Sequence, residues 1–135
     1  MSIVIVIGGV MISIIAVYTG SVIIILWGIA HLFPTGAIVK GFGEISADNK
    51  KILIMEWVGI GLWMCFAGVL CLLITALGYG RNDAARVVYA TASAMLMLSA
   101  VLGFATGFQT SILPIKLCPF VQMLCSTLVL SGASL

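Results

Sequence analysis

The sequence predicts an all-α integral membrane protein, folded as a compact antiparallel bundle of four transmembrane helices. Two observations support this fold class. The charged residues (6 Lys and Arg, 4 Asp and Glu) fall into short clusters, and four long stretches carry none of them: residues 1–39, 57–80, 87–115 and 117–135. In addition, 63% of the residues are hydrophobic and only 7% are charged, whereas a soluble domain has roughly a quarter of its residues charged. Such a chain is suited to lipid and not to water.

We place the four spans at about residues 3–33, 52–77, 84–108 and 115–135, with a polar loop at 34–51. A hydrocarbon layer of about 30 Å is crossed by about 20 helical residues. The spans therefore use nearly all of residues 1–135, which we interpret as a single transmembrane domain. The N-terminal stretch lacks the positive start and the cleavage site of a signal peptide, so we expect it to be a retained first span.

The first span, from about Ile3 to Phe33, is longer than the membrane requires. Two arrangements remain open: the helix tilts and protrudes, or it bends at Tyr18–Ser21, where hydroxyl groups and a glycine loosen the backbone. We expect the span to end before Pro34, because a proline pushes the residue before it out of helical geometry.

The connections between the later spans also carry recognisable signals. Ser46 is the expected N-cap of the second span, with Asp48 in the positive first turn of that helix. The two glycines and polar residues at 78–83 predict a tight turn before the third span. The fourth span is expected to begin around Pro114 to Pro119, because proline is tolerated in a first helical turn.

The lysines and arginines predict an orientation in the membrane. The loops at 34–51 and 109–116 share one side, which carries four lysines (Lys40, Lys50, Lys51 and Lys116), whereas the other side carries two arginines (Arg81 and Arg86). Cytoplasmic loops are enriched in positive charge. We therefore expect these two loops in the cytoplasm, both termini outside, and the plasma (inner) membrane as the location.

Small residues recur every four positions in the third span, at Ser99, Gly103 and Gly107. This small-xxx-small spacing forms a groove that lets another helix approach closely. Two readings remain open: packing within the bundle, or a docking face for a partner membrane subunit or a second copy of the chain.

Two ionisable residues, His31 and Glu56, lie within apolar sequence. Both fall near the same side of the membrane, because the first two spans are antiparallel neighbours. An ionisable group within a span is costly unless it is paired, and it is by default a candidate functional residue. We therefore expect a His31–Glu56 hydrogen bond, acting either as a structural pair or as the acid and base of a catalytic site.

Four further residues reach the same region and are candidate ligand or interface residues: Trp27, Trp57, Lys116 and Cys118. One histidine, one glutamate and one distant cysteine do not form a recognisable metal site, so no metal is expected. His31 alone is compatible with axial ligation of a haem or chlorophyll held in a larger assembly, and the cofactor remains unknown. The four cysteines form no CxxC pair, which argues against thiol–disulfide chemistry.

No motif in the chain specifies a reaction, and the net charge of +2 without a basic tract argues against nucleic acid as a partner. We expect the lipid bilayer as a partner, and we expect one of three functions. The first is an accessory or structural subunit of a membrane assembly or homo-oligomer. The alternative is a small membrane enzyme or binding protein for a lipophilic substrate that uses His31 and Glu56. The third is transport or proton conduction by an oligomer.

Overall fold

The computed structural model describes residues 2–135 and confirms the predicted fold class. The described residues form five α-helices: α1 Ser2–Leu32, α2 Thr35–Gly41, α3 Ala47–Ala76, α4 Asp83–Ala105 and α5 Leu113–Leu130. Two 3-10 turns, η1 Gly107–Gln109 and η2 Ser131–Ser134, follow α4 and α5. Four of these segments, built on α1, α3, α4 and α5, are long and apolar enough to cross a membrane. The chain is a four-span helical membrane protein.

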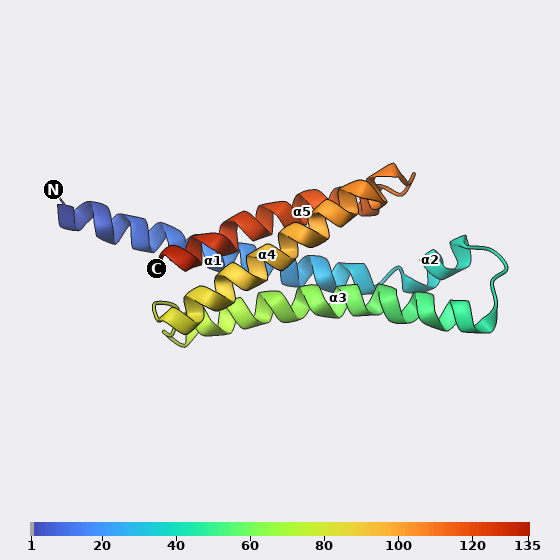
Figure 1. Ribbon diagram of the computed structural model, residues 1–135, viewed down its shortest axis with the longest axis horizontal. Coiled ribbons are helices and arrows are strands. Elements are labelled where there is room, and N and C mark those ends of the chain that lie inside the picture. The colour runs from blue at the N-terminus through green and yellow to red at the C-terminus, as the bar shows by residue number, and fades with distance from the viewer. Residues whose placement is uncertain (1) are drawn as a thin grey trace.

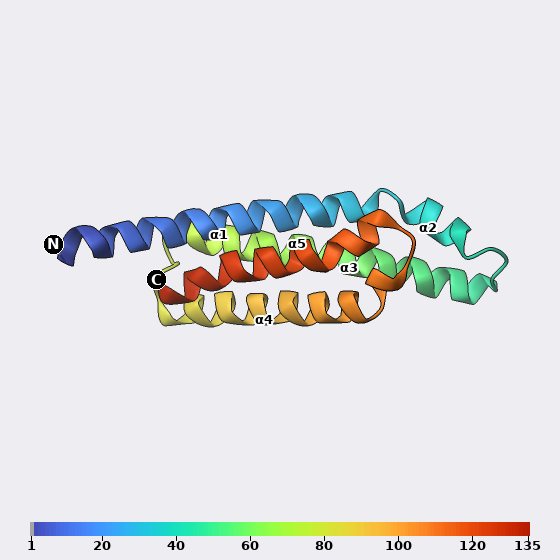
Figure 2. The same ribbon diagram turned by 90° about the horizontal axis from the view of Figure 1, so that it is seen from above.

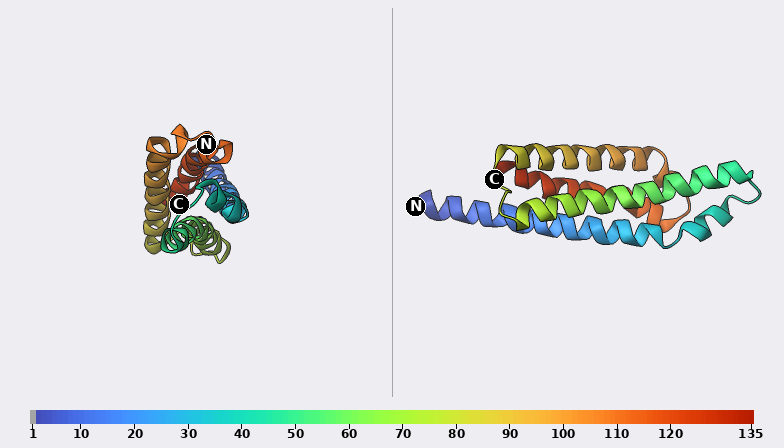
Figure 3. Two further views of the ribbon diagram at one scale, coloured as in Figure 1. Left: turned by 90° about the vertical axis from the view of Figure 1, so that its right-hand side faces the viewer. Right: turned by 90° about the horizontal axis from the view of Figure 1, so that it is seen from below.

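The helices form two antiparallel pairs. α1 packs against α3, α4 packs against α5, and α5 also packs against α1, so that it lies between α1 and α4 (Figure 2). α3 and α4 follow each other in the chain but touch little. They lie close at their connecting turn and separate toward the other end of the bundle (Figure 1; end-on in Figure 3).

The helix ends agree with two of the sequence signals, and the loop between α1 and α3 contains one helix that was not predicted. α1 continues without a break through Tyr18–Ser21 and ends at Leu32, before Pro34. α3 begins at Ala47 because Ser46 is its N-cap, as predicted: the Ser46 Oγ accepts from the Asn49 N–H at 3.1 Å. The loop at 34–51 contains an unpredicted short helix, α2.

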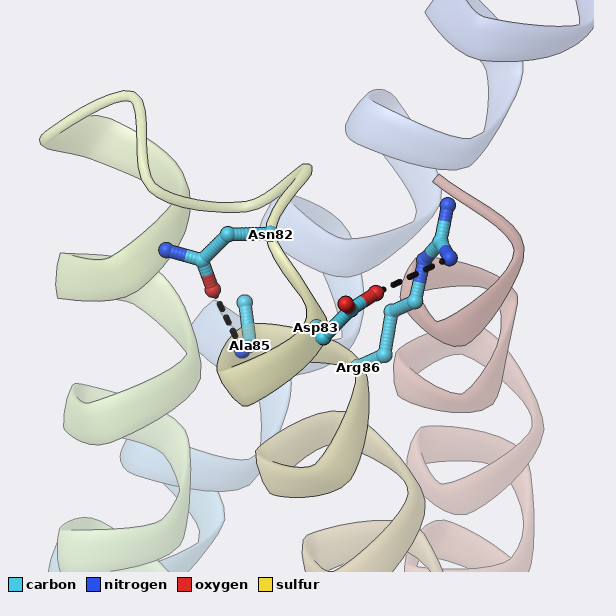
Figure 4. A network of polar contacts seen from close by, with 4 residues as sticks. All are labelled: Asn82, Asp83, Ala85 and Arg86. Carbon is cyan, nitrogen blue, oxygen red and sulfur yellow. Dashed lines mark hydrogen bonds and ion pairs between the residues drawn. The ribbon is translucent and has the colours of Figure 1, made fainter.

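The turn between α3 and α4 is fixed by local hydrogen bonds. Gly78 adopts a positive φ of 79°, and the N–H of Tyr79 donates to the carbonyl of Ile74 at 3.1 Å, which is the pattern of a Schellman C-cap. Asn82 is the N-cap of α4, and its Oδ1 accepts from the Ala85 N–H at 2.7 Å (Figure 4). Beside this cap, Arg86 pairs with Asp83 at 3.3 Å (Figure 4).

The outer surface of the bundle is apolar at mid-helix positions, whereas several buried side chains are polar. Phe66 on α3 and Leu98 on α4 are each 63% exposed. The buried polar side chains are Ser21, Ser93, Gln122 and Ser126. Exposed apolar groups cost nothing in hydrocarbon, whereas buried polar groups need partners inside the protein. The Ser126 hydroxyl donates to the carbonyl of Ser93 at 2.8 Å, whereas the hydroxyl oxygens of Ser21 and Ser93 have no partner among the described residues.

Candidate functional site

A cavity of about 600 Å³ lies at the end of the bundle where α2 and the α4–α5 connection are found. Residues of α1, α3, α4, α5 and α2 all contribute to its wall. The chain has three tryptophans, and all of them line this cavity: Trp27, Trp57 and Trp63. The rest of the wall is mainly aliphatic. The cavity is within the range of about 300–1,000 Å³ that is usual for small-molecule sites.

His31, at the last turn of α1, lines the cavity and stacks on Trp57 of α3. Their ring centroids are 4.1 Å apart and the planes differ by 14°. The His31 Nε2 atom is buried and has no hydrogen-bond partner among the described residues. A buried polar atom without a partner is rare and calls for an explanation, such as a water molecule or a ligand. His31 lines the cavity as a residue, whereas its Nε2 atom is covered by the surrounding protein.

Trp57 also fixes the backbone beneath His31. Its indole N–H donates to the carbonyl of His31 at 2.8 Å, and the hydroxyl of Thr35 donates to the carbonyl of Leu32 at 2.7 Å. The last four carbonyls of a helix have no partner within that helix. The two side chains therefore satisfy two of these carbonyls, those of His31 and Leu32.

A second contact across the cavity joins α1 to α5. The indole N–H of Trp27 donates to the Cys118 Sγ at 3.4 Å, and both residues line the cavity. Three of the four predicted ligand or interface residues (Trp27, Trp57 and Cys118) therefore meet His31 at one cavity. They are brought together from α1, α3 and α5.

Glu56 does not join them, and the expected hydrogen bond between His31 and Glu56 is not formed. Glu56 is exposed, and the two ion pairs of the described residues are Lys51–Asp48 and Arg86–Asp83. Successive residues of an α-helix point about 100° apart. Because Trp57 occupies the face of α3 that meets α1, its neighbour Glu56 points elsewhere.

Lys116 also lies outside the cavity wall. Its Nζ is 6.0 Å from the centroid of the Phe108 ring, within a group of aromatic side chains that includes Phe104 and Phe120. A lysine over an aromatic face is held by a cation–π attraction. Lys116 is thus placed at the end of the bundle, beside the cavity and not in it.

The small residues Ser99, Gly103 and Gly107 all line the cavity. A Cβ on Gly103 would lie 3.2 Å from Pro119, and a Cβ on Gly107 would lie 2.8 Å from Ile115. Both glycines therefore face α5 of the same chain. α4 ends at Ala105, three residues before the predicted end of the third span, and Gly107 lies in the following 3-10 turn, η1.

Sequence reasoning passed over many of the lining residues, among them Trp63 on α3 and Gln122 on α5. Gln122 is the more unusual of the two. Its side chain is buried on α5, lines the cavity, and its Nε2 lies 3.6 Å from the Met64 Sδ. An amide in the middle of an apolar span was the available signal. The described residues hold no group of three or more His, Cys, Asp or Glu side chains close enough to bind a metal ion.

No protein family, curated protein or solved structure matches this chain. The fold and the site therefore define a class only: a four-span helical membrane protein with an aromatic-lined cavity at one end.

Proposed function

We propose that this protein binds a lipophilic small molecule in the cavity beside His31. The observation that carries the proposal is the cavity itself: about 600 Å³ of space, lined by three tryptophans and aliphatic side chains, with few polar atoms. Ligand sites of this kind are mostly apolar and contain a few polar groups that fix orientation. A bilayer supplies lipophilic molecules at high local concentration, so such a site needs no route through water.

The opening of the cavity supports entry from the bilayer. Three of the lining residues are large, apolar and exposed: Ile60 on α3 (43%), Leu102 on α4 (64%) and Ile112 just before α5 (41%). Ile60 and Leu102 lie on the two helices that separate at this end of the bundle (Figure 1). An opening rimmed by apolar side chains excludes ions and favours hydrocarbon. The ligand therefore enters sideways, between α3 and α4.

We favour this binding function over two others that the sequence suggested, an acid–base enzyme and a docking subunit. An acid–base reaction shared by His31 and Glu56 is not part of it, because acid and base must both reach the reacting atoms and Glu56 is exposed away from the cavity. A subunit that docks through Ser99, Gly103 and Gly107 is also not favoured, since Gly103 and Gly107 face α5.

The orientation remains part of the proposal. The connections at 33–46 and 106–112 lie at one end of the bundle, and the turn at 77–82 lies at the other with both ends of the chain (Figure 1). The first end carries the four lysines and the second carries the two arginines. We assign the lysine end, and with it the cavity, to the cytoplasmic half of the plasma membrane.

A cavity-filling substitution tests the binding function. Ala30 lines the cavity, whereas its neighbour Ile29 is not in the cavity wall and is 42% exposed. Ala30→Phe is expected to weaken binding of a brominated dodecanol at least about tenfold, because the new ring occupies the space that the alkyl chain needs. Ile29→Phe adds the same ring outside the cavity and serves as the matched control.

Binding is measured by quenching of tryptophan fluorescence in mild detergent, because bromine quenches nearby indoles and all three indoles line the cavity. The wild-type protein and Ile29→Phe should show saturable quenching at the same concentration. Quenching that never saturates in the wild type, or that is unchanged in Ala30→Phe, would mean that the cavity is not a binding site.

A further inference from the structure

We infer that the ligand is an uncharged lipophilic alcohol, and that the side chain of Gln122 recognises its hydroxyl group. This inference rests on the proposed binding function and adds the chemical class of the ligand and the residue that selects it. Three observations lead to it: an amide oxygen that is left free in the cavity, a hydroxyl group level with it on the next helix, and a cavity wall without acidic or basic side chains.

Gln122 is a carboxamide enclosed in the interior of an apolar bundle. Its side chain is only 3% exposed and lines the cavity. The Nε2 end of the amide lies 3.6 Å from the Sδ of Met64, a weak acceptor on a residue outside the cavity wall. The Oε1 end accepts no hydrogen bond from the described residues. Leaving a buried acceptor unsatisfied is unfavourable, so a donor that reaches this oxygen gains more than it would at a water-exposed site.

The amide oxygen of Gln122 can be reached from the cavity. The buried polar atoms that are both covered and without a partner in the described part of the chain are the Ser21 Oγ, the Ser93 Oγ and the His31 Nε2. The Gln122 Oε1 also lacks a partner there, but it is not one of these covered atoms. Part of its surface is therefore free, and the space that Gln122 lines is the cavity. Gln122 differs in this respect from His31, whose nitrogen is covered by protein.

A hydroxyl group lies level with Gln122 on the neighbouring helix. A Cβ on Gly103 would lie 3.2 Å from Pro119, so these two positions of α4 and α5 face each other. Ser99 is one turn before Gly103 and Gln122 is about one turn after Pro119, which brings both to the same depth in the antiparallel pair. Ser99 lines the cavity, and its hydroxyl has no partner among the described residues, whereas that of Thr106 on the same wall donates to its own helix. A guest hydroxyl at this depth can donate to Gln122 and accept from Ser99.

The wall of the cavity favours an uncharged head group. The described residues that line it include no Asp, Glu, Lys or Arg. Burying an ionised group without an opposite charge costs far more than one hydrogen bond returns. A carboxylate, phosphate or ammonium head would therefore lose its hydration without finding a counter-charge, whereas a hydroxyl loses little and gains the amide oxygen.

The order of the helices places Gln122 on the far side of the cavity from the proposed opening. α3 packs on α1, and α5 packs on both α1 and α4, so a molecule that enters between α3 and α4 meets α1 and α5 as the opposite wall. Gln122 is on α5, whereas the exposed Ile60 and Leu102 are on α3 and α4. The alcohol therefore enters with its hydroxyl first, and its apolar body lies between the tryptophans and the opening.

The test compares three brominated probes of one chain length by quenching of tryptophan fluorescence in mild detergent: the brominated dodecanol, bromododecane, which lacks the hydroxyl, and brominated dodecanoate in alkaline buffer, where its carboxylate is ionised. Each concentration is expressed as a mole fraction in the detergent, which removes differences in partitioning. In the wild-type protein we expect the alcohol to half-saturate at about tenfold lower mole fraction than bromododecane, as one buried hydrogen bond predicts. The carboxylate should need a higher mole fraction than the alcohol.

The variant Gln122→Leu removes the amide and keeps an apolar side chain of similar size. The brominated dodecanol should then half-saturate at about tenfold higher mole fraction than in the wild type, whereas bromododecane should bind no more weakly than before. Gln109→Leu is the matched control, because Gln109 is the other glutamine of the chain, is exposed, and is not in the cavity wall. All three probes should bind this control as they bind the wild type.

Each contrary outcome overturns a defined part of the inference. If the alcohol has no advantage over bromododecane in the wild type, the inference fails and the proposed binding function stands. An advantage that survives in Gln122→Leu overturns the role of Gln122, and a carboxylate that binds as tightly as the alcohol overturns the uncharged head group.

Two further arms keep the result decisive. If Gln122→Leu does not fold, Gln122→Met, which is unbranched like glutamine, replaces it, and the wild-type comparison of the three probes still decides whether a neutral hydroxyl is preferred. If the brominated dodecanol itself shows no saturable binding to the wild type, the proposed function fails together with this inference, and the two failures are distinguished by that first titration.

Discussion

Trp57 connects two parts of the site through a single side chain. Its ring face stacks on His31 at 4.1 Å, and its N–H donates to the carbonyl of the same residue at 2.8 Å. The hydrogen bond satisfies a helix-terminal carbonyl in a segment where water is scarce. The indole is thus a structural clamp on α1 as well as a wall of the cavity.

The contribution of this clamp can be measured with Trp57→Phe. Phenylalanine keeps an aromatic face for His31 but cannot donate to its carbonyl, so the free energy of unfolding should fall by about 1–2 kcal/mol. Trp27→Phe is the matched control, because the Trp27 N–H reaches only a sulfur, at 3.4 Å, which is a weak acceptor. Thermal unfolding in mild detergent compares the two. Equal losses in both variants would show that the His31 carbonyl does not depend on Trp57.

At the scale of the helices, the close approach of α1 and α3 depends on glycine. A Cβ on Gly68 would lie 2.7 Å from the carbonyl oxygen of Ser21, and one on Gly28 would lie 2.8 Å from the carbonyl oxygen of Gly61. Backbone atoms cannot move aside as a flexible side chain can. The two helices would have to separate to accept any larger residue at these positions.

Gly68→Ala is therefore expected to destabilise the protein by about 1–3 kcal/mol, as overpacking does in a well-packed interior. Gly59→Ala is the control on the same helix, since a Cβ at Gly59 meets nothing within 4 Å. There the gain in helix propensity should leave stability unchanged or raise it by up to about 1 kcal/mol. A stable Gly68→Ala variant, unfolding at the wild-type temperature, would contradict the close approach of α1 and α3.

The sequence was sufficient to predict the helices but not how they are rotated. Long uncharged stretches, the Ser46 cap and Pro34 are local signals, and each was confirmed. Counting residues from the helix ends placed His31, Glu56 and Trp57 at a similar depth in the membrane. The count could not show whether Glu56 or Trp57 faces His31, because neighbouring residues of a helix have nearly the same depth and differ in the direction of their side chains. In an all-round apolar helix no periodic pattern reveals which face is buried.

Two other features escaped prediction for related reasons. α2 is a short helix of seven residues within the polar loop, and its one buried side chain, Val39, meets partners that only the tertiary structure supplies. Pro119 lies inside α5, not in its first turn. It lies against Gly103 of α4, a contact that local sequence cannot show.

For the molecule as a whole, the length of the packed bundle matches the thickness of the hydrocarbon layer of a membrane. At one end Ser13 meets the C-terminal turn, where its carbonyl accepts from Ser131 at 3.4 Å, and at the other end α1 stops at Leu32. These positions are about 20 residues, or about 30 Å, apart along the helix, which is the thickness of the hydrocarbon layer. α2 and the first turns of α3 extend past the ends of α4 and α5 (Figure 1). The charged residues at 40–51 belong to these segments and to the connection between them.

The four-span architecture makes a prediction about sidedness that labelling can check. Glu44 lies in the connection between α2 and α3, and Arg81 lies in the turn between α3 and α4, with both side chains exposed. One span separates these two positions, so Glu44→Cys and Arg81→Cys should react with a membrane-impermeant maleimide from opposite sides of the membrane. With the lysine-rich end in the cytoplasm, Arg81→Cys should react in intact cells and Glu44→Cys only after permeabilisation. The protein without an added cysteine measures the background labelling of the four native cysteines, of which Cys71 and Cys125 are buried. Reaction of both variants from one side would contradict the crossing of α3, whereas a reversed pair of results would keep the four spans and invert only the proposed orientation.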